Sequence, residues 1–190
     1  MDDKLLILDL DETLIHSRAT RLAYQHDFQC SDYYVYKRPY LDEFLSFIAS
    51  SFEIAIWTSA NSEYAKCIIS NIFPANYPIT FIWSRERCTP LYFHPSESID
   101  MDSHIYIKDL KKIKNRGYDL TRVLVIDDSP KQLQRSYGNL VPVNPFLGDR
   151  DDDDLELLKT YLTFLNESDD VRVIEKRGWQ SSFRKELSRY

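Results

Sequence analysis

Short unbroken apolar runs alternate with stretches of helical periodicity along most of the chain. The apolar runs cover residues 4–9, 53–58, 79–83, 122–128 and 140–143. A run without polar alternation is typical of a strand buried on both faces, as in a parallel sheet. Between the runs, apolar residues recur every three or four positions, as on one face of a helix. The helices predicted in this way cover residues 39–50, 61–72, 129–135 and 151–166. Strands that alternate with helices predict an α/β fold with a central, mainly parallel sheet.

Two segments interrupt this alternation. Residues 18–38 are rich in tyrosine and polar residues, which indicates a β-hairpin or flap. Residues 85–106 contain two prolines, two histidines and scattered aromatic residues, which indicates an irregular insert or a small sheet. Neither segment has the size of a separate domain.

Reactive side chains stand at the ends of three predicted strands. In open α/β sheets, sites form outside the carboxyl ends of the strands, so these side chains are expected to converge. Several carboxylates in one crevice repel each other unless a cation is present, and a hard divalent ion such as Mg²⁺ suits oxygen ligands. The residues concerned are Asp9 and Asp11, Thr58 and Ser59, and Asp127 and Asp128.

Asp9 and Asp11 form the sharpest element of this set. Carboxylates two residues apart at a strand end can turn into one pocket, where one attacks an electrophile while the other transfers a proton. An aspartate that attacks a phosphoryl group gives an aspartyl phosphate, which water then hydrolyses. The alternative is a turn in which the two aspartates only cap the next segment.

Composition narrows the classes of protein that remain. With 43% hydrophobic residues the chain is not disordered throughout, and with only 4 glycines among 190 residues it is not collagen-like. The 24 basic and 30 acidic residues give a net charge of −6, which argues against nucleic acid as a partner. No apolar run approaches the ~18 residues of a membrane helix, so no membrane partner is expected.

The cysteines and the first residues of the chain indicate the cellular compartment of the protein. Cys30, Cys67 and Cys88 are widely spaced and form no Cys-x-x-Cys pair, so we expect buried small hydrophobic residues in a reducing compartment. The chain opens with Met-Asp-Asp and passes directly into an apolar strand, which predicts no signal peptide. These features predict a monomer located in the cytoplasm or nucleus.

Six ordered motifs resemble one family of phosphatases. They are Leu8-Asp-Leu-Asp-Glu-Thr-Leu-Ile-His-Ser17, Lys37-Arg-Pro-Tyr-Leu-Asp-Glu-Phe-Leu45, Trp57-Thr-Ser-Ala60, Arg85-Glu-Arg-Cys88, Tyr106-Ile-Lys-Asp-Leu110 and Val125-Ile-Asp-Asp-Ser-Pro130. They resemble the haloacid dehalogenase superfamily and, within it, the small C-terminal-domain phosphatase or NLI-interacting-factor-like family. The resemblance spans roughly residues 4–166. It implies a haloacid-dehalogenase-like Rossmannoid fold with a small β flap and an insert in place of a large cap.

The resemblance also implies a role for each matched residue. Asp9 is the expected nucleophile, and Asp11 is the general acid and later the general base. Thr58 is expected to hydrogen-bond the phosphoryl oxygens, with Ser59 as an alternative donor, and Lys108 to neutralise charge. Because Lys108 precedes Lys111, Lys112 and Lys114, it could instead belong to a solvated helical face.

The expected cofactor is Mg²⁺. By resemblance, its ligands are the Asp9 and Asp128 carboxylates and the backbone carbonyl of Asp11, while Asp127 orients the metal shell. The Asp127-Asp128 pair departs from the Asp-Asn pair common in the polymerase phosphatases.

The resemblance leaves several functions open. Relatives that act on small molecules often carry a large cap, which is missing here, so the expected substrate is phosphoserine or phosphothreonine on a protein. The alternatives are a small-molecule or nucleotide phosphatase with the same chemistry, and a non-catalytic phosphatase-like interaction domain. Four flap tyrosines either contact the substrate or pack the hairpin; they are Tyr24, Tyr33, Tyr34 and Tyr36.

Two further segments are strongly charged. We expect residues 1–170 to form the catalytic domain and residues 171–190 to form a basic segment that docks on it or contacts an acidic partner. Residues 171–190 carry +4, which leaves −10 for residues 1–170. The acidic run at residues 149–154 is expected to be solvated and to favour the N-terminus of the helix that follows.

Overall fold

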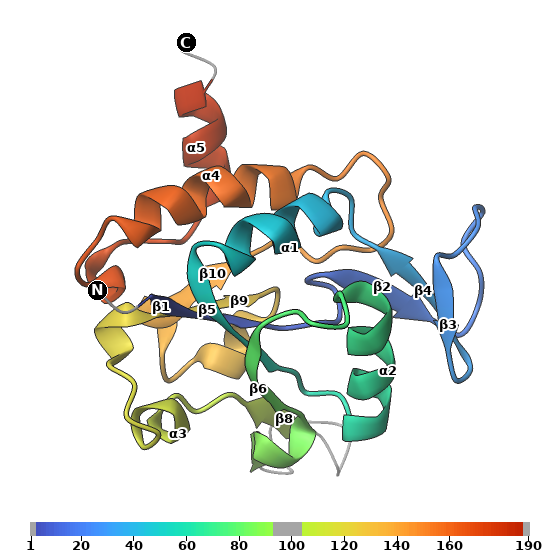
Figure 1. The fold of residues 1–190 in the computed structure, drawn as a ribbon, viewed down its shortest axis with the longest axis horizontal. Coiled ribbons are helices and arrows are strands. Elements are labelled where there is room, and N and C mark those ends of the chain that lie inside the picture. Colours follow the sequence, from blue (N-terminus) through green and yellow to red (C-terminus); the bar gives the residue numbers. More distant parts are fainter. Residues whose placement is uncertain (1–2, 93–103, 188–190) are drawn as a thin grey trace.

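A five-stranded parallel sheet forms the centre of the computed structural model, which describes residues 3–92 and 104–187 (Figure 1). The strands are β1 (Lys4–Leu8), β5 (Phe52–Trp57), β6 (Ile79–Trp83), β9 (Val123–Asp127) and β10 (Leu140–Pro142). Their order across the sheet is β10-β9-β1-β5-β6, and all four pairings are parallel. The predicted α/β fold and the five predicted strands are therefore confirmed.

Helices cover both faces of this sheet, because alternate strand residues point to opposite sides. On one face, Leu6 and Leu8 join a core formed with α1 (Leu41–Ala49), α2 (Ser62–Ile72) and α4 (Asp154–Asn166). The opposite face contains Leu5 and Ile7 in a second core with α3 (Lys111–Lys114) and a 3₁₀ turn at Pro130–Leu133. That turn replaces the longer helix predicted over 129–135. No helix in the described ranges is long and apolar enough to span a membrane.

The chain crosses the middle of the sheet in a way that creates a crevice. From β1 it passes outward to β5 and β6, and it then returns to the opposite side of β1 to form β9. Adjacent parallel strands whose connections leave in opposite directions open a crevice at their carboxyl ends. Asp9 follows β1 and Asp127 ends β9, so both stand at this position.

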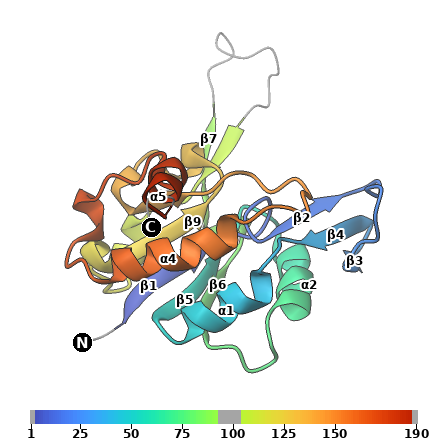
Figure 2. The same ribbon diagram turned by 90° about the horizontal axis from the view of Figure 1, so that it is seen from above.

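Two small antiparallel sheets lie outside the core. The flap consists of β2 (Ile15–Arg18), β4 (Tyr33–Lys37) and β3 (Phe28–Cys30), and it starts three residues earlier than predicted. It lies beside α2 (Figure 1). The predicted insert contains a 3₁₀ turn at Arg85–Arg87 and a ribbon of β7 (Thr89–Tyr92) and β8 (His104–Ile107), which projects from the body (Figure 2). Residues 93–103 of that insert lie outside the described residues.

The expectation for the cysteines is wrong for two of the three. Cys30 at the end of β3 and Cys67 on α2 form a disulfide with a Cα–Cα distance of 6.0 Å. Only Cys88 is free, and it is buried, as predicted. The sequence could not predict the pair, because its members are 37 residues apart and meet only when the flap packs against α2.

The C-terminal basic segment makes extensive contacts with the core. Val171 is fully buried, and Trp179 at the start of α5 (Trp179–Leu187) is 2% exposed. The indole of Trp179 stacks on Tyr161 of α4 at 4.5 Å, and its Nε1–H donates to the carbonyl of Pro142 at 2.6 Å. The segment therefore covers the edge of the sheet at β10.

Replacing Trp179 with Phe is expected to lower the free energy of unfolding by about 1–2 kcal/mol, because the hydrogen bond and part of the stacked area are lost. The melting temperature should fall by roughly 2–8 °C. The matched control is Val173→Ala in the same segment, where the side chain is 78% exposed and a change within about 0.5 kcal/mol is expected. Equal melting temperatures for the two variants would contradict a stabilising role for the docked indole.

Candidate active site

A tight loop after β1 sets the direction of the first two acidic side chains. The carbonyl of Leu10 accepts hydrogen bonds from the backbone N–H groups of Leu14 at 2.8 Å and Ile15 at 3.2 Å. Glu12 within this loop has a φ of 58°, a left-handed conformation that is uncommon for residues other than glycine. Such strain is typical of functional sites. The loop therefore reverses the chain next to the carboxyl ends of the sheet strands.

Lys108 is the buried centre of the site. Its ammonium Nζ donates to Asp9 Oδ1 and to Asp127 Oδ2, both at 2.6 Å. The Lys108 and Asp127 side chains are fully buried, and the Asp9 side chain is 6% exposed. One ammonium thus neutralises part of the charge of two carboxylates that come from different strands. Lys108 does not belong to a solvated helical face, since α3 begins only at Lys111.

Burial and charge shift the protonation equilibria of these groups. Burial by itself would lower the pKa of Lys108, but the Asp127 and Asp9 carboxylates outweigh it and raise that pKa above its ordinary value. Burial raises the pKa of Asp9, and the Lys108 charge opposes that rise. The ammonium therefore stays protonated and holds the Asp9 carboxylate in position.

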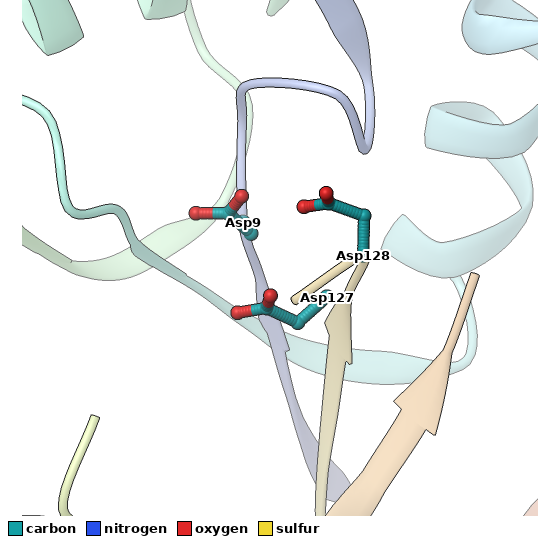
Figure 3. Close-up of side chains that lie close together, drawn as sticks. All are labelled: Asp9, Asp127 and Asp128. Carbon is teal, nitrogen blue, oxygen red and sulfur yellow. The ribbon is translucent and has the colours of Figure 1, made fainter. Parts of the chain in front are cut away.

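Asp128 completes an acidic group beside this ion pair. Asp9, Asp127 and Asp128 each offer one carboxylate oxygen within 4.8 Å of the others, and all three carboxylates face a common space (Figure 3). Burial and the neighbouring Asp127 raise the pKa of Asp128 to about 6. The Thr13 hydroxyl accepts from the Asp128 backbone N–H at 3.2 Å and lies 3.5 Å from its Oδ1. The group is therefore held by the loop that carries the first motif.

The carboxyl of Asp11 is turned away from that group and toward α2. Its Oδ1 accepts hydrogen bonds from the Tyr64 hydroxyl at 2.5 Å and from the Ser17 hydroxyl at 3.3 Å. Burial raises the pKa of Asp11, although both hydroxyl contacts favour the charged form. A carboxyl with a raised pKa and one oxygen fixed by hydroxyls is suited to give and take a proton through its other oxygen. The sequence predicts a helix over residues 61–72, which contains Tyr64, but its pattern does not predict that the Tyr64 hydroxyl contacts Asp11.

Replacing Tyr64 with Phe is expected to lower kcat for an aryl phosphate roughly 10-fold, because one hydrogen bond that fixes the Asp11 carboxyl is lost. Tyr118→Phe is the matched control, since the Tyr118 hydroxyl also donates to a carboxylate, that of Glu53, at 2.5 Å. Glu53 belongs to the opposite end of β5, so kcat should stay within about 2-fold. A kcat for Tyr64→Phe equal to that of the control would show that the hydroxyl does not position Asp11.

Thr58 and Ser59 follow β5 at the same edge of the sheet. The Thr58 side chain is 1% exposed, and its Oγ1 accepts from the backbone N–H of Ala60 at 3.0 Å. The backbone carbonyl of Ser59 accepts from Arg85 Nε at 2.7 Å. By register, Ile56 pairs with Leu8, so the residues after each strand stand next to each other. Thr58 and Ser59 therefore flank the loop that carries Asp9.

The acidic run at 149–154 forms ion pairs that the sequence did not predict. Asp152 binds the buried guanidinium of Arg38 through two hydrogen bonds of 2.7 and 2.8 Å, and Asp154 binds it at 3.2 Å. The same guanidinium donates to the backbone carbonyl of Thr13 at 3.0 Å. Asp153 instead pairs with Arg184 of α5. As expected, Asp149 and Asp151 are exposed and α4 begins at Asp154. The expectation is wrong for Asp152, which the fold brings to Arg38 across 114 residues.

A hollow of about 340 Å³ opens beside Asp11. The flap supplies Ser17, Ser31 and Tyr33 to its lining, and α2 supplies Glu63 and Tyr64. The remaining lining residues are Ala60, Asn61 and Arg85. Most of its lining side chains are therefore polar or aromatic and come from surface elements.

Of the four flap tyrosines, three pack within the flap and one lines the hollow. Tyr36 is buried, and its hydroxyl accepts from the Leu22 N–H at 2.7 Å, while Tyr24 packs against Tyr36 at 5.0 Å. Tyr34 lies under the Arg21 guanidinium at 4.8 Å. Only Tyr33, which is 45% exposed, lines the hollow.

A family model for NLI interacting factor-like phosphatase matches residues 4–172. The chain belongs to this phosphatase family. The family predicted from the motifs is thus confirmed, over nearly the whole chain.

Two curated relatives and one solved structure are similar to this chain. The CTD small phosphatase-like protein 2 of Dictyostelium discoideum is 32% identical over 174 residues, covering 88% of this chain and 28% of its own length. Nuclear envelope morphology protein 1 of Saccharomyces cerevisiae is 29% identical over 191 residues, covering 90% and 41%. The structure of Fcp1, an essential RNA polymerase II CTD phosphatase, matches with a TM-score of 0.55 and 24% identity, covering 86% and 49%. This chain spans less than half the length of each of these proteins.

Proposed function

We propose that this chain is a Mg²⁺-dependent phosphatase that hydrolyses phosphoserine and phosphothreonine on proteins through an aspartyl phosphate at Asp9. The observation that carries the proposal is the Lys108 ammonium, which binds Asp9 and Asp127 at 2.6 Å beside Asp128. Phosphoryl transfer needs positioning and charge compensation more than elaborate covalent chemistry. A fixed carboxylate beside a buried cation supplies both.

The acidic group fits a magnesium ion. Three aspartates provide hard oxygen donors within 4.8 Å of one another, and only one ammonium offsets their charge. We propose that the Asp9 and Asp128 carboxylates and the Asp11 backbone carbonyl hold the ion. Asp127 has a supporting role, since its oxygens already accept from Lys108 and from the Ser129 N–H at 2.8 Å. When bound, Mg²⁺ would offset the charge of the transferring phosphoryl group.

In the first step, Asp9 attacks the phosphorus of the phosphomonoester. A bond forms between a carboxylate oxygen of Asp9 and phosphorus, and the bond from phosphorus to the serine or threonine oxygen breaks. Asp11 gives its proton to that leaving oxygen, which departs as a hydroxyl. Lys108 and the donors at Thr58 and Ser59 compensate the charge of the phosphoryl oxygens.

In the second step, water hydrolyses the aspartyl phosphate. Asp11, now a carboxylate, takes a proton from the water as the water oxygen attacks phosphorus. The acyl–phosphate bond breaks, inorganic phosphate leaves, and both aspartates return to their starting states. The raised pKa of Asp11 supports this role, because the group must be protonated at the start and at the end of each cycle.

The hollow beside Asp11 supports a protein substrate. The flap and the insert are small, and no additional domain is present among the described residues to enclose the site. We therefore place residues 1–170 as the catalytic domain, with the segment after residue 170 docked on it. A small-molecule phosphatase remains the second candidate within enzymes, and an interaction domain without catalysis remains the third.

The relatives' names support two further parts of the proposal. Relatives named as a CTD small phosphatase-like protein and a nuclear envelope morphology protein are consistent with a phosphoprotein substrate and with a cytoplasmic or nuclear location. We propose a monomer with neither nucleic acid nor membrane as a direct partner, which the net charge of −6 favours for nucleic acid.

Hydrolysis of a phosphopeptide panel and a metabolite panel, with Mg²⁺ titrated in each, tests the proposal. We expect Mg²⁺-dependent release of phosphate and a higher kcat/KM for phosphoserine or phosphothreonine peptides. A preference for phosphorylated metabolites would favour the second candidate. No hydrolysis of any phosphomonoester with Mg²⁺ would leave the interaction domain.

A further inference from the structure

A covalent bond joins the two walls of the hollow beside Asp11. Cys30 directly precedes Ser31 and lies three residues before Tyr33, both of which line the flap wall. Cys67 follows Tyr64, which lines the opposite wall, by one helical turn of α2. The Cys30–Cys67 disulfide therefore connects the flap wall to the helix wall next to the residues that form them.

Without this bond, only its pairing with β4 and its packing against the core would hold β3 in place. β3 has only three residues and pairs only with β4, so it is an edge strand. The turn after it contains Ser31 with a φ of 51°, a conformation that disfavours residues with a side chain. Across the hollow, Tyr33 contacts the Tyr64 ring edge-on at 5.9 Å. An edge strand with a strained turn is expected to move when its tether is cut.

We propose that Cys30 and Cys67 form a thiol–disulfide exchange site, and that its redox state sets the affinity of the hollow for a phosphopeptide. The inference rests on the proposed function for the identity of the ligand. The oxidised form holds both walls in place before binding. Peptide binding therefore loses no free energy to ordering of the flap. The reduced form frees β3 and the turn at Ser31, while β2 with Ser17 stays paired with β4, and it binds the peptide more weakly.

The exchange has a defined direction of attack. Cys30 is 1% exposed, whereas Cys67 is only partly buried, so attack on the disulfide is expected at the Cys67 sulfur. A thiolate of a dithiol attacks the Cys67 sulfur, the S–S bond breaks, and Cys30 leaves as a thiolate that takes up a proton. The second thiol of the reductant then displaces Cys67 and closes a cyclic disulfide. Two electrons and two protons pass from the dithiol to the protein.

Small and large substrates should respond differently to this exchange. An aryl phosphate occupies the phosphoryl site near Asp9 and Lys108 and does not need the flap wall. A phosphopeptide extends into the hollow and contacts both walls. Reduction should therefore raise the KM for the peptide about 3- to 10-fold and leave kcat/KM for the aryl phosphate within about 2-fold.

The experiment compares the full chain before and after treatment with dithiothreitol, which is then removed under nitrogen. Thiol titration in denaturant should give one free cysteine before treatment and three after it, a readout independent of phosphatase activity. Both kinetic constants are then measured with Mg²⁺. Cys67→Ser should match the reduced protein and not respond to the reductant, whereas Cys88→Ser should respond as the unmodified chain does.

Three kinds of result would overturn the proposed exchange site. Three free thiols before reduction would overturn the exchange site, as would an unchanged peptide KM in the reduced protein and in Cys67→Ser. Equal losses with both substrates would show a general structural role and would also overturn it. If neither substrate is hydrolysed in any form, the proposed function fails; phosphopeptide binding measured by fluorescence anisotropy then tests the inference alone, and equal Kd values for the oxidised and reduced forms overturn it.

Discussion

Replacing Asp9 with Asn is expected to abolish hydrolysis of an aryl phosphate, with kcat/KM falling at least about 10³-fold. The amide has no negative charge and is a poor nucleophile, while its size keeps the surrounding packing. Stability should not fall with activity, because the change removes one of three carboxylates that face a single ammonium. The measurements are steady-state kinetics with Mg²⁺ and thermal unfolding of the same preparation.

Asp42→Asn is the matched control for Asp9→Asn. The Asp42 carboxylate is 78% exposed on α1 and makes only a 3.8 Å contact with Lys37. The same chemical change there should leave kcat/KM within about 2-fold. If Asp9→Asn kept more than a tenth of the activity, another group would have to be the nucleophile.

Replacing Arg38 with Ala is expected to lower the free energy of unfolding by about 3–5 kcal/mol, the second-largest effect we expect. Its side chain is fully buried, and the Asp152 and Asp154 side chains are 14% and 5% exposed. Removal of the guanidinium takes away the cation that pairs with Asp152 and leaves the buried Asp154 carboxylate with only a 3.4 Å ion pair to Arg184 among the described residues. It also frees the Thr13 carbonyl, whose residue contacts Asp128 through its hydroxyl. Chemical denaturation measures the first effect.

Arg184→Ala provides the comparison for Arg38→Ala within the same acidic run. Arg184 pairs mainly with Asp153, where both side chains are nearly half exposed, and reaches Asp154 only at 3.4 Å, so the expected loss is below about 1 kcal/mol. Arg38→Lys should recover only part of the stability, since an ammonium cannot reproduce the two-point contact with Asp152. If Arg38→Ala and Arg184→Ala lowered the free energy of unfolding equally, burial of the Arg38 ion pair would not add to its stabilising effect.

Much of the site could be predicted because it depends on where strands end. Asp9 and Asp127 follow apolar runs, and the rule that parallel strands place their carboxyl ends at one edge requires no knowledge of packing. Lys108 belongs to no such pattern, and only the resemblance of Tyr106-Ile-Lys-Asp-Leu110 to a motif of the family placed it in the site. The structure fixes it there through a hydrogen bond from its backbone N–H to the carbonyl of Gln132 at 2.8 Å.

Contacts between distant segments could not be predicted from local patterns. Cys30 and Cys67 pair because the flap folds against α2, and Arg38 meets Asp152 because α4 returns across α1. Tyr64 has the periodicity of an apolar helix residue, and nothing in the sequence shows that its hydroxyl reaches Asp11. Each of these contacts depends on the relative placement of whole elements, which residue spacing does not specify.

The contact between Arg38 and Asp152 also bears on the order in which the protein folds during synthesis. The ribosome makes the loop with Asp9 and Asp11 first, but the carboxylates that neutralise the guanidinium beside it come more than a hundred residues later. A nascent chain that ends before residue 152 carries Asp9 and Asp11 on a loop whose buried cation has no carboxylate partner from this run. The loop can therefore reach its final form only late in translation, which delays catalytic competence until most of the domain has emerged.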